Sequence, residues 1–184
     1  MNKDAIWDIY FNPVTLTTLS LLEETVLLGG HGDHLEIGTL FGGSAIATAM
    51  LKVRHGFSGQ VFCIDPWDWN LLTSTMQEHC VCPPSPEIVM ANAQLFGVAD
   101  RVRVFKGKSN PLPGFQANFS TAYIDGDHTH KAVSADWYSV FPLVSKAVLF
   151  DDLWALTKLL QEQIDPNPEW TVKRQDGMAL VIRR

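Results

Sequence analysis

The segment Leu35-Glu36-Ile37-Gly38-Thr39-Leu40-Phe41-Gly42-Gly43-Ser44 leads from a short apolar run, through a glycine turn, into a helical pattern that begins at Ala45. Such a turn leaves backbone N–H groups free at the positive end of a helix dipole, where a carboxylate or a phosphate binds well. The G-x-x-x-G-G spacing differs from the G-x-G-x-x-G fingerprint of dinucleotide-binding folds. Glu36 would repel a phosphate and suits a cationic ligand, and a plain tight turn is the alternative interpretation.

On both sides of this segment, short apolar runs alternate with longer helical patterns, which is typical of repeated strand–helix–strand units. Strands are predicted at His34–Ile37, Gln60–Ile64, Val102–Phe105, Thr121–Ile124, Ala147–Phe150, Thr171–Arg174 and Ala179–Ile182. Helices are predicted at Val14–Leu28, Ser44–Arg54, Glu87–Phe96, Thr129–Val144 and Leu153–Ile164, with a short segment near Pro113–Asn118. Continuously apolar strands are typical of sheets covered on both faces. We therefore expect an α/β fold, a three-layer αβα sandwich around a seven-stranded, mostly parallel sheet.

The end of the chain carries a turn signal, Gln175-Asp176-Gly177, between the last two predicted strands. Asp-Gly favours a tight hairpin, so one strand of the sheet should be antiparallel. A length of 184 residues predicts a single domain over 1–184, with an N-terminal helical extension over 1–30 and an irregular insertion over 68–86.

The composition excludes several classes of protein. With 46% hydrophobic residues and ten Phe, the chain can bury a core and is not disordered. Fourteen Lys and Arg against 20 Asp and Glu give a net charge of −6, which argues against a nucleic-acid partner. Neither a leader pattern nor an apolar run of ~18 residues is present, so we expect a cytoplasmic protein without a membrane partner. Cys80 and Cys82 lack the second ligand pair of a closed zinc site.

Asp65 closes the second predicted strand, about twenty residues beyond the glycine turn. An acid at this place in an α/β fold can accept hydrogen bonds from a ribose diol. The alternative is a helix cap or an ordinary loop carboxylate.

Three further acids, Asp125, Asp151 and Asp152, follow two strands that should be neighbours in the sheet, about 5 Å apart. Converging carboxylates repel one another unless a cation lies between them. Oxygen ligands select a hard ion, so we predict Mg²⁺ or another hard divalent cation held by these three residues. The alternative is that Asp151 or Asp152 caps the helix that begins at Leu153.

Glu36-x-Gly38-x-x-x-Gly42, together with Asp65, resembles the cofactor site of class I S-adenosylmethionine-dependent methyltransferases. Their Rossmann-like sheet of seven strands also ends in an antiparallel hairpin strand. The run Ile124-Asp125-Gly126-Asp127-His128-Thr129-His130, followed by Phe150-Asp151-Asp152, is similar to the metal-dependent O-methyltransferases of the macrolide-sugar and cephalosporin-cluster branch. The resemblance extends from about residue 30 to residue 184.

The resemblance implies roles for individual residues. Cofactor contacts would come from Glu36, Gly38, Thr39, Gly42, Ser44, Asp65, Trp67, Ser109 and Asp125. Within this set, Ser44 would hold the methionine carboxylate or is an ordinary helix serine, Ser109 would meet the adenine edge, and Trp67 would cover the adenosine or pack as core. His128 would be the general base, since its ordinary pKa lies near neutrality. His130 and Asp127 are the reserve candidates for that role, and Asp127 could also replace Asp125 as a metal ligand or bind the metal with it.

The expected function is that of an S-adenosylmethionine-dependent, Mg²⁺-dependent O-methyltransferase acting on a small-molecule hydroxyl. The alternative is a protein that binds S-adenosylmethionine without methyl transfer, or a subunit of a larger assembly. A nicotinamide-dependent oxidoreductase is disfavoured by the glycine spacing. The Pro-Gly-Gly turn common in the resembling family is replaced by Val144-Ser145-Lys146. Little chain remains for a substrate lid, so the acceptor could be large or a homo-oligomer could complete the pocket.

Overall fold

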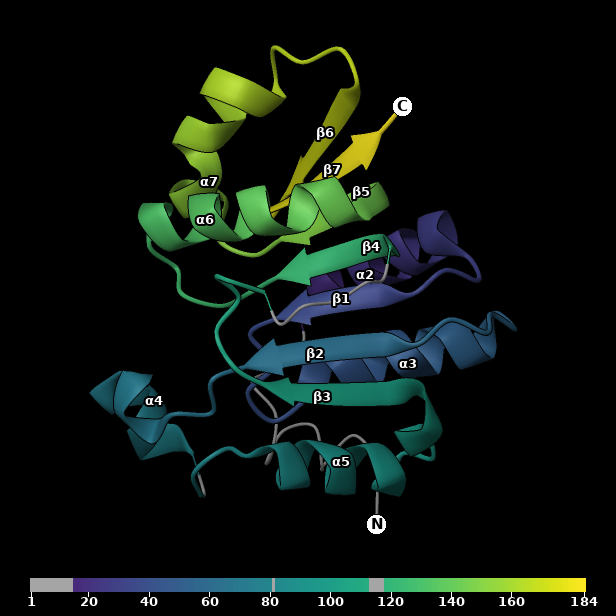
Figure 1. Ribbon diagram of the computed structural model, residues 1–184, viewed down its shortest axis with the longest axis vertical. Coiled ribbons are helices and arrows are strands. Elements are labelled where there is room, and N and C mark those ends of the chain that lie inside the picture. Colours follow the sequence, from purple (N-terminus) through teal and green to yellow (C-terminus); the bar gives the residue numbers. More distant parts are fainter. Residues whose placement is uncertain (1–14, 81, 113–117) are drawn as a thin grey trace.

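The computed structural model describes residues 15–80, 82–112 and 118–184, and it is built around one seven-stranded sheet (Figure 1). The strand order is β3-β2-β1-β4-β5-β7-β6, and β7 is antiparallel to both of its neighbours, whereas the other pairings are parallel. The strands are β1 (His34–Ile37), β2 (Val61–Asp65), β3 (Val102–Lys106), β4 (Phe119–Ile124), β5 (Val144–Phe150), β6 (Trp170–Gln175) and β7 (Met178–Arg183). Each overlaps a predicted strand, so the α/β expectation is confirmed.

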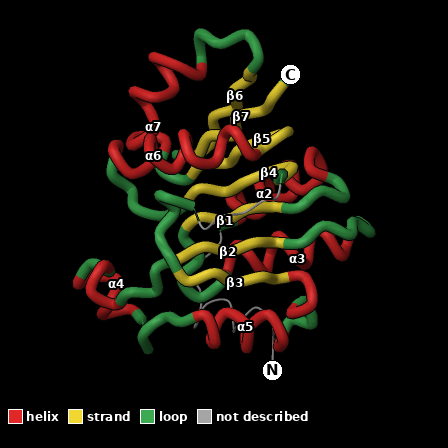
Figure 2. Tube along the Cα trace, viewed as in Figure 1, coloured by secondary structure: helices red, strands yellow, loops and turns green. Residues whose placement is uncertain are grey.

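Helices cover both faces of this sheet (Figure 2). On one face lie α2 (Leu16–Gly29), α3 (Gly43–Arg54) and α5 (Pro86–Leu95). On the other face lie α6 (His130–Val140) and α7 (Leu153–Leu159). The Rossmann-like three-layer arrangement predicted from the apolar strands is therefore observed.

The strands bury side chains on alternate faces, because successive side chains of a strand point in opposite directions. In β2, Val61 and Cys63 pack with α3 and α5, whereas Ile64 packs with the core under α6 and α7. In β1, Leu35 and Ile37 also face α6 and α7. The remaining side chains of β1 therefore lie on the α3 face, and they include a buried acid, Glu36.

Two predicted helices end earlier in the structure. The helix expected over Thr129–Val144 ends at Val140, and a 3₁₀ turn over Phe141–Leu143 leads directly into β5. Pro142 explains this, since proline removes a helical N–H and restricts the residue before it. The last helix ends at Leu159 and continues as a π-helical segment over Leu160–Ile164.

The insertion over 68–86 is more regular than expected, with a 3₁₀ turn at Trp69–Leu71 and the short helix α4 (Ser74–His79). Of the other predicted segments, Val14 and residues 113–117 lie outside the described residues.

The predicted hairpin is confirmed, because β6 and β7 pair with Gln175 opposite Met178. Asp176 and Gly177 form the two-residue turn with φ values of 46° and 84°. Positive φ at both positions is the signature of a type I′ turn. No helix in the described part of the chain has both the length and the apolar character needed to cross a membrane.

Candidate active site

The carboxyl ends of β1, β2, β4 and β5 meet at one edge of the sheet, on the left in Figure 1. Backbone hydrogen bonds extend the parallel pairing one residue beyond the strands. Gly38 N donates to Ile64 O at 2.9 Å, and Asp125 N donates to Ile37 O at 2.8 Å. In the same way, Asp151 N donates to the carbonyl at the end of β4 at 3.1 Å. The glycine turn and two of the predicted metal ligands therefore lie side by side.

Gly38 cannot be replaced by another residue without strain. Its φ is +82°, and an added Cβ would lie 2.0 Å from the carbonyl oxygen of Asp125. Gly42 has a φ of +91° and is the N-cap of α3, with Val89 Cγ1 2.9 Å from the position of an added Cβ. The glycines let the turn lie directly against the segment that follows β4 and against α5.

Asp65 is held by the turn that follows β1. Its Oδ2 accepts hydrogen bonds from the backbone N–H groups of Thr39 and Leu40 at 2.8 and 2.9 Å. Its Oδ1 accepts one from Trp67 N at 2.6 Å. Because a carboxylate oxygen has two lone pairs, Oδ1 keeps the capacity to accept another donor, as a ribose contact requires.

Trp67 is only 5% exposed and belongs to the core cluster beneath α3 and α5. Its indole N–H donates to Leu40 O at 2.8 Å. This placement favours the packing interpretation of Trp67 over a cover for the adenosine. Through this hydrogen bond, the buried indole helps to hold the glycine turn in place.

Glu36 is fully buried under the start of α3. Burial raises the pKa of its carboxyl group to about 8, and the charge of Asp65 adds to this rise. The rise is opposed by the hydroxyls of Ser44 and Thr39 and by the backbone N–H of Ala45. Neither carboxylate oxygen makes a hydrogen bond of ordinary geometry within the described residues. Ser44 lies half-buried in the first turn of α3, where the N–H groups have no helical acceptor.

Asp125 lies beside a second carboxylate in a mostly buried position. Burial, and then the neighbouring charge of Asp151, raise its pKa well above the usual range. The hydroxyl of Tyr123 donates to Asp125 Oδ2 at 3.1 Å. Tyr123 was not predicted as a site residue, although its position two residues before Asp125 places it on the same face of β4.

Asp125, His128 and Asp151 each offer one ligand atom to a common cluster, and these atoms all lie within 4.8 Å of one another. A carboxylate pair and an imidazole at this spacing could hold a divalent cation. This group contains His128, the predicted base, in place of Asp152.

Asp152 instead forms an ion pair with Nδ1 of His128. It is the N-cap residue of α7 with a φ of +49°, but its side chain makes no capping hydrogen bond, in contrast to the alternative interpretation of this acid as a cap. The start of α7 is held by the β6–β7 turn, because Leu153 N donates to Gly177 O at 2.5 Å. The hairpin therefore positions the acidic pair after β5, a role that the sequence did not indicate.

The reserve candidates for the base have other partners. His130 is the first residue of α6, and its Nδ1 is 2.8 Å from Ala155 O. Asp127 Oδ1 accepts a hydrogen bond from Thr129 N at 2.9 Å, as in a turn. These contacts leave His128 as the candidate whose ring belongs to the acidic cluster.

Ser109, predicted to meet adenine, lies in the loop after β3, and its hydroxyl donates to Oδ1 of Asp136. Asp136 is only 3% exposed, on the inner face of α6. Sequence reasoning missed it, but the signal was present: Asp136 interrupts the apolar i, i+3, i+4, i+7 positions formed by Val133, Trp137 and Val140.

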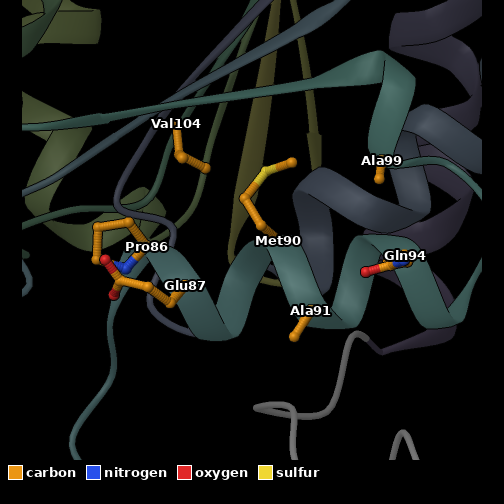
Figure 3. Close-up of a pocket in the computed structure, with 7 residues that line it drawn as sticks. All are labelled: Pro86, Glu87, Met90, Ala91, Gln94, Ala99 and Val104. Atoms are coloured by element: carbon orange, nitrogen blue, oxygen red, sulfur yellow. The ribbon is translucent and has the colours of Figure 1, made fainter.

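A surface groove of about 480 Å³ lies elsewhere, between α5 and β3 (Figure 3). It contains none of the predicted site residues and is lined by Pro86, Glu87, Met90, Ala91, Gln94, Ala99 and Val104. The candidate site is thus defined by its side chains and not by this groove.

A family model described as "Methyltransferase domain" matches residues 35–153, which contain the glycine turn, Asp65 and the acidic cluster. The chain belongs to this methyltransferase family. It is a class I S-adenosylmethionine-dependent methyltransferase, and the strand order with its antiparallel β7 agrees with that assignment. None of the curated proteins matches the sequence.

Solved structures share the fold of this methyltransferase. The O-methyltransferase NovP superposes with a TM-score of 0.74 at 17% identity, over 94% of this chain and 81% of NovP. The O-methyltransferase from Bacillus cereus, solved in complex with SAH, gives 0.67 at 18% identity, over 98% and 87%. The O-methyltransferase TomG from Streptomyces achromogenes, involved in tomaymycin synthesis and solved with SAM, gives 0.66 at 16% identity, over 97% and 85%.

The residues of the methyltransferase site fit S-adenosylmethionine. The turn offers free N–H groups at the start of α3 for its carboxylate, and Asp65 keeps acceptor capacity for its ribose. The buried carboxyl group of Glu36 makes no hydrogen bond of ordinary geometry within the described residues, and a cationic cofactor beside it would favour its ionised form. The chemistry of these groups therefore agrees with the family.

Proposed function

We propose that this methyltransferase transfers a methyl group to a hydroxyl of a small molecule, next to a hard divalent cation held at the carboxyl edge of the sheet. The observation that carries the proposal is the cluster of Asp125, His128 and Asp151, whose ligand atoms lie within 4.8 Å of one another. The cluster is adjacent to the glycine turn, since Gly38 contacts the Asp125 carbonyl. The O-methyltransferase names of NovP and TomG support the same reaction.

The donor set fits Mg²⁺, Mn²⁺ or a similar ion, because carboxylate oxygens prefer hard cations. Two ligand sets are compatible with the residues. The resemblance implies Asp125, Asp151 and Asp152, whereas the side-chain arrangement groups Asp125 and Asp151 with His128. When bound, the ion lowers the pKa of an acceptor hydroxyl and orients that group.

The residues of the chain divide the remaining work. Asp65 would hold the ribose and Ser44 the methionine carboxylate, which fixes the sulfonium methyl for an in-line displacement. With the ligand set of Asp125, Asp151 and Asp152, the ion pair of Asp152 with Nδ1 of His128 leaves Nε2 available to take the proton of the acceptor hydroxyl. Tyr123 holds Asp125 in place by its hydrogen bond.

The first test is calorimetry with S-adenosylhomocysteine, with and without Mg²⁺, and with NAD as the comparison ligand. We expect binding of S-adenosylhomocysteine only. Transfer of labelled methyl groups is then measured on a panel of catechols and vicinal diols, with and without EDTA. Binding without transfer to any acceptor would favour the alternative of a non-catalytic cofactor-binding protein.

The metal is tested with Asp151→Asn. We expect loss of Mn²⁺ affinity and of turnover by at least about a hundredfold, since the variant removes a charged ligand from the cluster. Asp100→Asn is the matched control, because Asp100 is exposed and its carboxylate pairs with the adjacent Arg101. Unchanged turnover and metal affinity in Asp151→Asn would exclude the metal mechanism.

The two ligand sets are separated by titrating Mn²⁺ into Asp152→Asn and His128→Gln. If the resemblance gives the ligands, Asp152→Asn weakens the metal more than His128→Gln does. If the arrangement in the structure persists, His128→Gln has the larger effect on affinity. We also propose that the methyl acceptor is a small molecule with a hydroxyl group. A second copy of the chain would complete the pocket that binds it.

A further inference from the structure

The Ser109–Asp136 pair joins the loop after β3, for which the resemblance implies an adenine contact, to helix α6. Ser109 belongs to the loop after β3, and Asp136 lies on α6, which begins just after the loop that follows β4. The second oxygen of Asp136, Oδ2, lies under Gly126, at 3.7 Å from the position of an added Cβ there. One buried carboxylate therefore binds the loop after β3 and lies close to the loop after β4.

A carboxylate at this position is not explained by packing. The inner face of α6 is otherwise apolar, and an acid costs free energy there unless its hydrogen bonds are made. The hydroxyl of Ser109 supplies one such bond, while the negative charge of Asp127 lies near enough to be unfavourable. The position thus holds an acid whose side-chain partner is Ser109, the serine for which the resemblance implies an adenine contact.

The direction of this hydrogen bond determines what Ser109 can do next. An ionised carboxylate only accepts hydrogen bonds, so the single hydroxyl proton of Ser109 is committed to Asp136. The two lone pairs of the serine oxygen remain, and they can only accept. A hydroxyl fixed in this way matches the exocyclic amine of adenine and repels a carbonyl at the same ring position.

We propose that Asp136 is a positioning residue that fixes the Ser109 hydroxyl as an acceptor for the adenine amine, so that this pair makes the site select adenosyl over inosyl ligands. The inference rests on the proposed function and on the adenine contact that the resemblance implies for Ser109, and it is independent of the metal and of the methyl acceptor.

The test is calorimetry with S-adenosylhomocysteine and S-inosylhomocysteine, which differ in the amine and carbonyl at this ring position. The measurements are made at pH 8, above the pKa of about 6 to which burial raises the Asp136 carboxyl, so that the acid is ionised. We expect the wild-type protein to prefer the adenosyl ligand by roughly tenfold or more, as for a site built around a specific hydrogen bond.

Ser109→Ala should reduce this preference to within about threefold, because the acceptor is removed. Asp136→Asn should abolish or reverse it, since an amide can donate to Ser109 and free the hydroxyl proton for the inosyl carbonyl. Ser139→Ala is the matched control: its hydroxyl, also on α6, donates to Ala135 O, and the ratio should not change. Thermal denaturation checks the folding of each variant, and Ser109→Ala alone decides if Asp136→Asn does not fold.

A purely structural role predicts that the variants weaken both ligands equally, with an unchanged ratio. That result overturns the inference while leaving the proposed function intact. Failure of the wild-type protein to bind either ligand overturns both. Loss of the preference in both variants, with the control unchanged, supports the positioning role.

Discussion

The two ends of β1 each bury an ionisable side chain, but the two side chains differ in their hydrogen-bond partners. Near the amino end, Lys52 of α3 is fully buried, and its Nζ donates to the carbonyl oxygens of Gly30 and Gly32 at 3.2 and 2.7 Å. Near the carboxyl end, Glu36 is equally buried, and neither of its oxygens has a hydrogen-bond partner within the described residues.

The difference separates Lys52, whose hydrogen bonds are made within the fold, from Glu36, to which a bound ligand can supply the missing partner. A buried polar group is normally satisfied, and an unsatisfied one in a native fold needs an explanation. Lys52 binds two carbonyl groups of the loop before β1, so its hydrogen bonds need no ligand. Glu36 lies under the glycine turn of the methyltransferase site, where a cationic cofactor brings the opposite charge.

The largest expected effect on stability and binding comes from comparing two glycine substitutions, Gly38→Ala and Gly56→Ala. Gly38→Ala places a Cβ against the Asp125 carbonyl at positive φ, so we expect a loss of at least about 3 kcal/mol in the free energy of unfolding and no binding of S-adenosylhomocysteine. Gly56→Ala, after the C-terminus of α3, has the same sign of φ but open space, and should cost about 1 kcal/mol without affecting binding. Urea denaturation and calorimetry measure both, and equal losses would contradict the close approach at Gly38.

The second test is the pH dependence of stability at Glu36. Its pKa is raised to about 8 in the folded protein, whereas an unfolded Glu has a pKa near ~4.3. The folded state therefore holds this proton more tightly, and its stabilising contribution is complete below pH ~4.3 and lost as pH rises towards 8. Glu36→Gln removes this loss, so its stability relative to wild type should rise by up to about 1.4 kcal/mol per pH unit in that range.

The measurement for Glu36 is urea denaturation at several pH values between 5 and 8, without cofactor. Glu24→Gln is the control, because Glu24 pairs at the surface with Lys173 and its exchange should give a difference that does not grow with pH. A constant difference for Glu36→Gln as well would show that Glu36 is ionised throughout this range.

The smallest effect is expected near the amino end of β1, where the hydrogen bonds of Lys52 are made within the fold. Lys52→Met keeps an unbranched apolar stem but leaves two part-buried carbonyl groups without this donor, which should cost about 1–3 kcal/mol. The affinity for S-adenosylhomocysteine should remain within about twofold, because Lys52 serves the loop before β1 and not the site. A large loss of affinity at unchanged stability would contradict the division between the two ends.

The fold could be predicted from the sequence because the patterns that indicate its strands and turns are local. Each predicted strand overlaps an observed one, and the Asp176-Gly177 turn carries its own conformational preference. The boundaries failed where one residue overrides a periodic pattern, as at Pro142.

The site was accessible only in part, because side-chain partners arise from contacts between distant segments. The sequence places Asp65 at the edge, but it does not show that three backbone N–H groups hold its carboxylate. It likewise could not pair His128 with Asp152, or show that Trp67 is buried. Asp136 had a readable signal, an acid on an apolar helix face, whose meaning depended on Ser109.

The strand order also has a consequence for synthesis of the chain. The first 106 residues contain β1, β2 and β3, which form one half of the sheet and leave the outer edge of β1 open until β4 is made. Chains grow from the N-terminus, so an emerging chain carries the glycine turn and Asp65 well before Asp125 and Asp151 exist. A ribosome-bound chain that stops before residue 119 therefore has the cofactor loop and an open β1 edge, but neither β4 nor the metal cluster.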